Sequence, residues 1–227
     1  MRTEPLPHPI QYVIFDCDGV LVDSEILASQ TVLEMLAPYG FTMDPEEYGR
    51  RFAGKIEEDI LAIVRKEYSI TLPDDFLSQL RSAIERRLNR DLQPISGMKE
   101  VISDLSLPRA VVSNSRSDRV IASLKTAELT SLFGDALFAV EMVKRPKPAP
   151  DIYQYAARQL GVLPSECLVV EDSQSGVTAA HRAGMKVIGF LGASHIIAGH
   201  EEALKQAGAW TVVADAVALR TLFSQVL

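Results

Sequence analysis

Short, mostly apolar runs alternate with segments of helical periodicity over much of this chain. Runs of three to five such residues are typical of strands that are buried on both faces of a parallel sheet. There are six runs, at Tyr12–Phe15, Ala110–Val112, Ala136–Val140, Cys167–Val170, Val187–Phe190 and Thr211–Val213. Because helical patterns separate most of the runs from about residue 93 onward, we predict a doubly wound α/β fold.

One long region interrupts this alternation directly after the first run. Between about residues 24 and 90 there is no strand pattern, and apolar residues recur at helical spacing, as at Phe76, Leu80, Ile84 and Leu88. We predict a helical domain at residues 24–92, inserted into a core made of residues 1–23 and 93–227. An insert at this place would hang over the carboxyl ends of the strands, where ligands of α/β sheets bind. The alternative is that these helices only pack on the sheet.

The composition of the chain disfavours some classes of binding partner. The chain has 227 residues, with 23 Lys and Arg against 30 Asp and Glu, so its formal net charge is −7. Such a charge disfavours nonspecific binding to nucleic acid or to an anionic membrane. The two cysteines are too few for a disulfide framework. We find no signal-peptide pattern and expect a cytoplasmic protein; the oligomeric state stays open, and a monomer is compatible with the sequence.

The first run ends in a pair of acids, Asp16 and Asp18, followed by Gly19. Carboxylates crowded at the end of an apolar strand repel each other, so they need a cation. Oxygen ligands suit Mg²⁺. Acids at strand ends also serve simply to solvate a loop, and the pair alone does not exclude that reading.

Three further segments place polar groups where strands end or helices begin. A second acidic pair could complete a Mg²⁺ site, a serine turn could bind phosphate oxygens, and a lysine between prolines could meet a phosphoryl group. These are Glu171–Asp172, Ser113–Asn114 and Lys147. Taken singly, each has a simpler interpretation, namely a helix N-cap, a serine-rich turn and an exposed basic loop.

Together the four segments resemble the haloacid dehalogenase superfamily of phosphohydrolases. The likeness lies in DCDGVLVDS at 16–24, VVSNS at 111–115, KPAPD at 147–151 and VVEDSQSG at 169–176. The resemblance implies a Rossmann-like core with an all-helical cap inserted after the first motif. It implies a phosphatase that acts on a small phosphate monoester through an aspartyl-phosphate intermediate, with Mg²⁺ as cofactor.

The resemblance also implies roles for individual residues. Asp16 would be the nucleophile, and Asp18 would protonate the leaving oxygen and then activate water. The phosphate group would be bound by Ser113, Asn114 and Lys147. Mg²⁺ would be bound by the side chains of Asp16 and Asp172 and by the main-chain carbonyl of Asp18. Glu171 would lie near the ion or contact it through water. The family's dehalogenases lack the second acid of the first motif, so Asp18 favours phosphoryl transfer.

A basic segment of the insert suggests a substrate class. Arg50, Arg51 and Lys55 lie close together in sequence, and Gly54–Lys55 resembles the specificity loop of capped family members. Such cations could bind the hydroxyls or carboxylate of a sugar phosphate or sugar-acid phosphate, although a solvated basic face is the simpler alternative. A likeness to one subgroup of sugar-acid phosphatases extends over FDCDGVLVDSE at 15–25, DPEE at 44–47, RFAGK at 51–55 and VVSNS at 111–115. The specificity candidates are Arg51, Gly54, Lys55, Glu25 and Arg116.

Other functions share these features. A β-phosphoglucomutase-like mutase uses the same pair of aspartates and returns the phosphate to the sugar. A receiver-like signalling module or a non-catalytic binder of phosphosugars is a more distant alternative, disfavoured by the insert and the intact motifs. The four histidines, His8, His181, His195 and His200, have no metal-ligand spacing and no motif partner, so we assign them no role.

Overall fold

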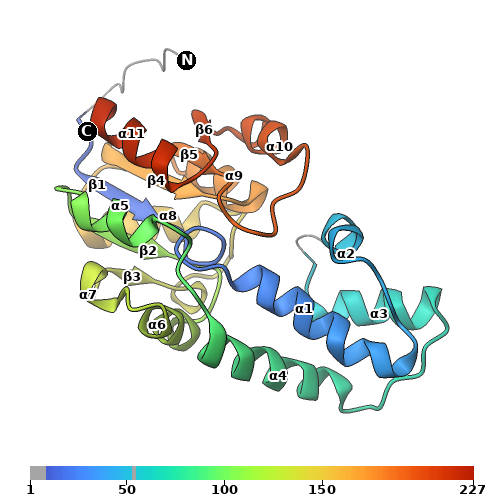
Figure 1. Ribbon diagram of the computed structural model, residues 1–227. Helices are drawn as coiled ribbons and strands as arrows, with labels where there is room; N and C mark the ends of the chain where they lie inside the picture. Colours follow the sequence, from blue (N-terminus) through green and yellow to red (C-terminus); the bar gives the residue numbers. More distant parts are fainter. Residues whose placement is uncertain (1–8, 53–54) are drawn as a thin grey trace. The chain divides into compact units, whose positions relative to one another are not determined.

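The computed structural model describes residues 9–52 and 55–227 (Figure 1). The chain divides into two compact units. One unit is Ser24–Leu92, and the other is formed by the chain on either side, up to Asp23 and from Gln93 to Leu227. We refer to these as the helical unit and the core unit.

The core unit is built on a six-stranded sheet in the order β3-β2-β1-β4-β5-β6, and every neighbouring pair is parallel. The strands are β1 Tyr12–Phe15, β2 Arg109–Val112, β3 Leu137–Phe138, β4 Cys167–Glu171, β5 Lys186–Phe190 and β6 Thr211–Val213. This is the doubly wound order, in which the chain moves outward from β1 first on one side and then on the other. The predicted fold class is confirmed.

Helices cover both faces of the sheet (Figure 1). They are α5 Met98–Asp104, α6 Ser117–Thr126, α7 Thr130–Phe133, α8 Asp151–Leu160, α9 Gln174–Arg182, α10 His200–Ala207 and α11 Ala216–Val226, with 3₁₀ turns η2 Val140–Met142 and η3 Pro164–Glu166. Successive side chains of β1 point to opposite faces of the sheet. Ile14 belongs to the cluster that includes Tyr153 of α8 and Val177 of α9, whereas the Phe15 ring lies edge-on to Phe133 and Phe223. Burial on both faces explains why the strand sequence is a continuous apolar run.

Four of the six strands have bounds that differ from the sequence prediction. β2 and β5 each begin one residue earlier than expected, at Arg109 and Lys186, while β3 is shorter and β4 is longer than expected. The run Ala136–Val140 was expected to be a strand throughout, but only Leu137 and Phe138 pair with β2. At this edge of the sheet the chain turns into η2, and the Val140 N–H donates to the Ser115 carbonyl. β4 extends one residue further than expected, because Glu171 pairs in register with Gly189 of β5.

The helical unit contains α1 Ser24–Leu36, α2 Pro45–Phe52, α3 Glu57–Glu67 and α4 Phe76–Asp91, with a 3₁₀ turn η1 at Ala37–Tyr39. The four apolar residues that predicted α4 are all buried. Asp44 caps α2, since its Oδ1 accepts from the N–H groups of Glu46 and Glu47. That these helices form a domain that caps the active site stays a prediction.

None of the helices in the described part of the chain combines the length and the apolar character needed to cross a bilayer.

The two-sided burial of β1 leads to a stability prediction. Phe15 is fully buried, so Phe15→Ala should lower the free energy of unfolding by about 3–5 kcal/mol through lost apolar contact and a residual cavity. Chemical denaturation of the full chain measures this loss. The control is Leu163→Ala at a side chain that is 64% exposed, where a change within about 0.5 kcal/mol is expected. Equal effects of the two substitutions would contradict the account of the core.

Candidate active site

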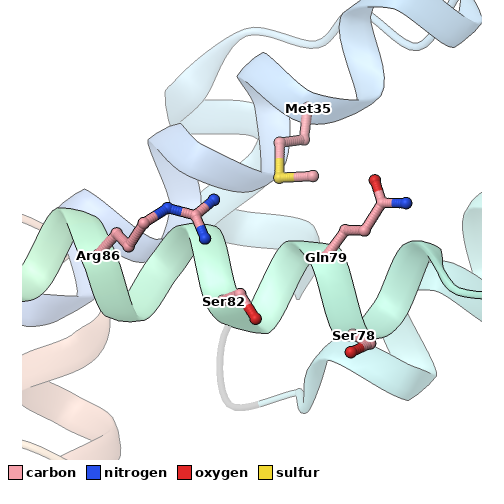
Figure 2. A pocket seen from close by; sticks show the side chains of 5 residues that line it. All are labelled: Met35, Ser78, Gln79, Ser82 and Arg86. Atoms are coloured by element: carbon pink, nitrogen blue, oxygen red, sulfur yellow. The ribbon is translucent and has the colours of Figure 1, made fainter.

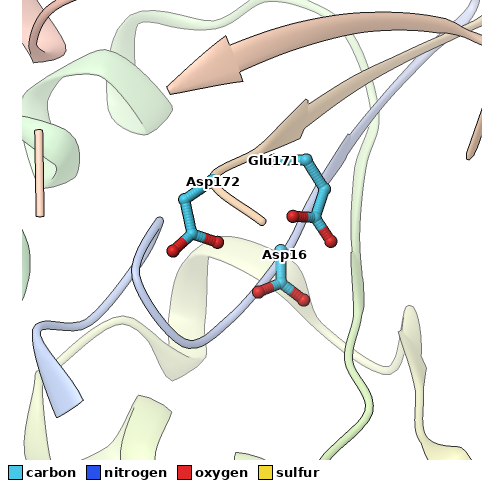
Figure 3. Close-up of side chains that lie close together, drawn as sticks. All are labelled: Asp16, Glu171 and Asp172. Atoms are coloured by element: carbon cyan, nitrogen blue, oxygen red, sulfur yellow. The ribbon is translucent and has the colours of Figure 1, made fainter. Parts of the chain in front are cut away.

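Three carboxylates meet at the carboxyl edge of the sheet. Asp16 directly follows β1, Glu171 is the last residue of β4 and Asp172 comes next. Because β1 and β4 are parallel neighbours, these side chains leave the sheet side by side and point toward one another (Figure 3). One oxygen from each lies within 4.8 Å of the others. The structure thus brings together three of the four residues that the sequence assigned to a metal.

A buried ammonium lies among these acids. Lys147 Nζ is 2.7 Å from Asp16 Oδ1, 2.8 Å from Glu171 Oε1 and 3.0 Å from the Val112 carbonyl oxygen. All three of its N–H donors therefore have acceptors. Lys147 is only 6% exposed, so the alternative of an exposed basic loop is wrong.

Burial and charge shift the pKa values of the groups in this cluster. Burial raises the pKa of Asp16 well above its usual range; the Lys147 charge opposes that rise, while Glu171 and Asp172 add to it. Burial also raises the pKa of Asp172, against the effect of His195. For Lys147, burial alone would lower the pKa, but the charges of Asp16 and Glu171 outweigh it, so the pKa is raised. When all three acids are ionised, their three negative charges outnumber the single positive charge of Lys147.

The donor set fits a hard divalent cation. The cluster offers carboxylate oxygens, which Mg²⁺ prefers. The single ammonium of Lys147 does not balance the negative charge of the three buried carboxylates. An additional cation bound among them would therefore be stabilised. Asp16, Glu171 and Asp172 could therefore hold Mg²⁺ beside Lys147.

The turn after β2 contributes a second group of contacts. Ser113 is buried, and its Oγ accepts from the Ser115 N–H at 2.9 Å. Ser115 Oγ in turn donates to Asp18 Oδ2 at 2.8 Å. This bond connects the turn after β2 to the second acid of the first motif. The sequence reasoning did not single out Ser115, although its place two residues after Ser113 on the same turn was the available signal.

Asn114 contacts the main chain of Lys147. Its Nδ2 donates to the Lys147 carbonyl at 3.2 Å, and its Oδ1 accepts from the Lys147 N–H at 2.9 Å. Arg145 and Asp151 form a paired contact of 2.9 and 2.8 Å across the same loop. Asn114 was predicted to bind phosphate; in this structure its amide holds the backbone of the lysine.

Two glycines let the carboxylates pack against backbone. A Cβ built at Gly19, whose φ is +81°, would lie 2.0 Å from Asp172 Oδ2. A Cβ built at Gly176 would lie 1.5 Å from Glu171 Oε1. A side chain at either place would displace an acid of the cluster, so each acid can lie this close only because the facing residue is a glycine.

Two histidines that we gave no role lie beside Asp172. His195 Nε2 is 3.3 Å from Asp172 Oδ2, and His200 Nε2 donates to the Asp172 main-chain carbonyl. Asp172 belongs to the motif at 169–176, so the expectation that these two histidines have no motif partner is wrong. It failed because these contacts depend on the path of the loop after β5, which no motif spacing encodes.

The specificity candidates of the helical unit are engaged in different ways. Arg51 pairs with Glu67 and donates to the Tyr68 hydroxyl, with its guanidinium over the rings of Phe52 and Tyr68. Lys55 is exposed, and Gly54 lies outside the described residues. Glu25 is an exposed residue in the first turn of α1. A part in specificity stays a prediction for these residues.

The remaining specificity candidate belongs to the core unit. Arg116 follows the turn after β2 and is exposed, with its Nε 3.5 Å from Asp118 Oδ1. The structure places it two residues beyond Asn114, at the N-cap of α6.

A hollow of about 340 Å³ lies along α1 and α4 of the helical unit, and Figure 2 shows the side chains that line it. It is lined by Met35, Ser78, Gln79, Ser82 and Arg86. None of the predicted site residues lines it, and it contains no carboxylate. The acidic cluster of the core unit, and not this hollow, is therefore the candidate site.

Known proteins resemble this chain in both sequence and fold. The model of the family described as haloacid dehalogenase-like hydrolase matches residues 13–190. The chain is 34% identical over 187 residues to the 6-phosphogluconate phosphatase of Escherichia coli (strain K12), covering 82% of this chain and 85% of that protein. These matches confirm the family resemblance and the subgroup likeness that the motifs indicated.

Two crystal structures superpose closely on the chain. A haloacid dehalogenase-like protein from Agrobacterium tumefaciens str. C58 has a TM-score of 0.88 at 40% identity, over 95% of this chain and 98% of that one. A HAD-family hydrolase from Deinococcus radiodurans R1, whose structure contains phosphate and sodium, has a TM-score of 0.88 at 34% identity, over 96% of each chain.

The cluster predicts a pH-dependent effect of removing the lysine. In the metal-free protein Lys147→Met leaves Asp16 and Glu171 without their cation, which should cost about 3–5 kcal/mol of unfolding free energy at about pH 8. The folded state binds the Asp16 proton more tightly than the unfolded chain, so the contribution of Asp16 to stability falls as pH rises above about 4. Losing Lys147 raises that pKa further, so the deficit should grow with pH.

Urea unfolding in the presence of a chelator, at about pH 5 and about pH 8, measures the deficit. Lys144→Met, at an exposed lysine of the same loop, is the matched control and should change stability by less than about 0.5 kcal/mol. A Lys147→Met deficit that is the same at both pH values would contradict the electrostatic account.

Proposed function

The chain belongs to the haloacid dehalogenase-like hydrolase family, as a phosphoric monoester hydrolase, and we propose that it hydrolyses a small sugar phosphate or sugar-acid phosphate such as 6-phosphogluconate. The observation that carries the proposal is the buried cluster in which Lys147 bridges Asp16 and Glu171 next to Asp172. A cation and a nucleophilic carboxylate held together in this way suit a dianionic phosphate ester.

In the first step a carboxylate oxygen of Asp16 attacks phosphorus, and the bond from phosphorus to the ester oxygen breaks. Asp18, held by Ser115 at 2.8 Å, gives its proton to the leaving oxygen. In the second step Asp18 takes a proton from water as that water attacks the phosphorus of aspartyl phosphate. Inorganic phosphate leaves and the Asp16 carboxylate is restored.

Lys147 and Ser113 bind the phosphoryl oxygens in this scheme. The ammonium lies 2.7 Å from the nucleophilic carboxylate, so it can offset the repulsion between two anions and the charge that develops on the transferring group. Asn114 holds the main chain of Lys147 on both sides, so when substrate arrives the backbone stays in place and the ammonium exchanges one of its three acceptors for a phosphoryl oxygen.

Asp16, Asp172 and the main-chain carbonyl of Asp18 would hold Mg²⁺, with Glu171 close by or connected through water. The ion would supply charge neutralisation at the phosphoryl oxygens and at Asp16. It would also keep Asp16 ionised despite the burial that raises its pKa.

The substrate class is supported by two observations. The similar E. coli protein is named for 6-phosphogluconate. The helical unit carries Arg50 and Lys55, two exposed cations that could bind a carboxylate or hydroxyls far from the phosphate. A helical cap that closes over the site would restrict it to small substrates and exclude water.

We predict that Asp16→Asn abolishes phosphate release, because an amide oxygen cannot form the acyl phosphate, while circular dichroism and the thermal midpoint show a folded protein. A fall in turnover of at least about a thousandfold is expected. Asp135→Asn, at an exposed aspartate, should leave turnover unchanged. Near-normal activity of Asp16→Asn would remove the proposed nucleophile.

A panel of phosphate esters tests the substrate class. Phosphate release should require Mg²⁺ and should be fastest with 6-phosphogluconate or a related sugar phosphate, measured against β-glucose 1-phosphate and nonsugar esters. Consumption of β-glucose 1-phosphate without phosphate release would identify the mutase instead. Silence on all esters, with folded protein and Mg²⁺ present, would contradict catalysis and favour a binding module.

A further inference from the structure

The loop that joins β5 to α10 returns to the acidic cluster. We propose that His195, on this loop, is a positioning residue that fixes the Asp172 carboxylate in the orientation needed to bind the divalent cation. This inference rests on the proposed function only in taking Asp172 as a ligand of that cation.

The contacts on Asp172 come from two places on the same segment. His195 Nε2 lies 3.3 Å from Asp172 Oδ2, and the two side chains are 26% and 6% exposed. His200, the first residue of α10, donates from Nε2 to the Asp172 carbonyl. The side chain and the main chain of one acid are therefore held by imidazoles five positions apart.

The backbone of Gly19 closes the opposite side of the same carboxylate. A Cβ built there would lie 2.0 Å from Asp172 Oδ2 and 3.1 Å from His195 Cε1. The carboxylate oxygen thus lies between a glycine backbone and an imidazole, with little room to rotate. A ligand held in one orientation loses less conformational freedom when it binds a metal.

His195 acts through Asp172 and is not itself a ligand of the cluster. Among the described residues, the carboxylate oxygens within 4.8 Å of one another come from Asp16, Glu171 and Asp172, and no imidazole nitrogen belongs to that set. Histidine is a good metal ligand, but here its nearest cluster partner is an oxygen of Asp172. The expected consequence of losing it is weaker binding of the cation with all carboxylate ligands still present.

The neighbouring residue anchors the loop. The Ser194 N–H lies 3.2 Å from Asp23 Oδ1, and Ser194 Oγ donates to the same carboxylate. Asp23 itself donates from its N–H to the Gln93 carbonyl. Since Ser194 is tied to another part of the core unit, His195 is presented to Asp172 from a fixed backbone.

The test is calorimetric titration of the metal-free full chain with Mg²⁺ alone. His195→Phe keeps the ring volume and removes the donor, and His195→Asn is too short to reach Asp172; both should weaken Mg²⁺ binding about 10- to 100-fold. His195→Gln retains an N–H donor near the position of Nε2 and should recover most of the affinity. His181→Gln, at an exposed histidine of α9, should bind like the wild type.

A second readout separates positioning from general damage. The Mg²⁺ concentration for half-maximal phosphatase activity should rise for His195→Asn, while kcat at saturating Mg²⁺ stays near the wild-type value. Wild-type affinity in both His195→Phe and His195→Asn would overturn the role of His195 and leave the proposed function intact. A wild type that binds no Mg²⁺ would overturn the proposed function and this inference together.

Discussion

The contact between the Lys147 ammonium and the buried carboxylates of Asp16 and Glu171 is the interaction on which the rest of the site depends. Removing carboxylates from water costs several kcal/mol each unless a cation and hydrogen bonds replace the lost hydration. Lys147 supplies that cation and spends all three donors in doing so. Its loop is held by Asn114 on one side and by the pair of Arg145 with Asp151 on the other.

The strand order explains why residues far apart in sequence share this site. β1 lies between β2 and β4, so the first motif meets the serine turn on one side and the second acidic pair on the other. Parallel strands direct their carboxyl ends to the same edge, where ligands of doubly wound sheets bind. The catalysis and metal binding that we propose would then be properties of this edge, and stability resides in the apolar interior beneath it.

Much of this arrangement could be predicted from the sequence. Asp16, Glu171 and Asp172 stand at the ends of apolar runs, and burial on both faces makes such runs recognisable as strands. The buried helix face of α4 followed from apolar residues at every fourth position. Contacts set by tertiary structure were not predictable: His195 and His200 reach Asp172 through a loop, Asn114 turns to the Lys147 backbone, and the third strand shortens at the sheet edge.

The central claim is that the phosphoryl group passes through Asp16, and trapping that intermediate tests it most directly. In Asp18→Asn an activated ester such as p-nitrophenyl phosphate needs no acid to expel its leaving group, whereas hydrolysis of the intermediate still needs the base. Rapid quenching followed by intact mass spectrometry should show one added phosphoryl group, and peptide mapping should place it on Asp16. Nitrophenol release without any adduct, or an adduct on another residue, would contradict the account.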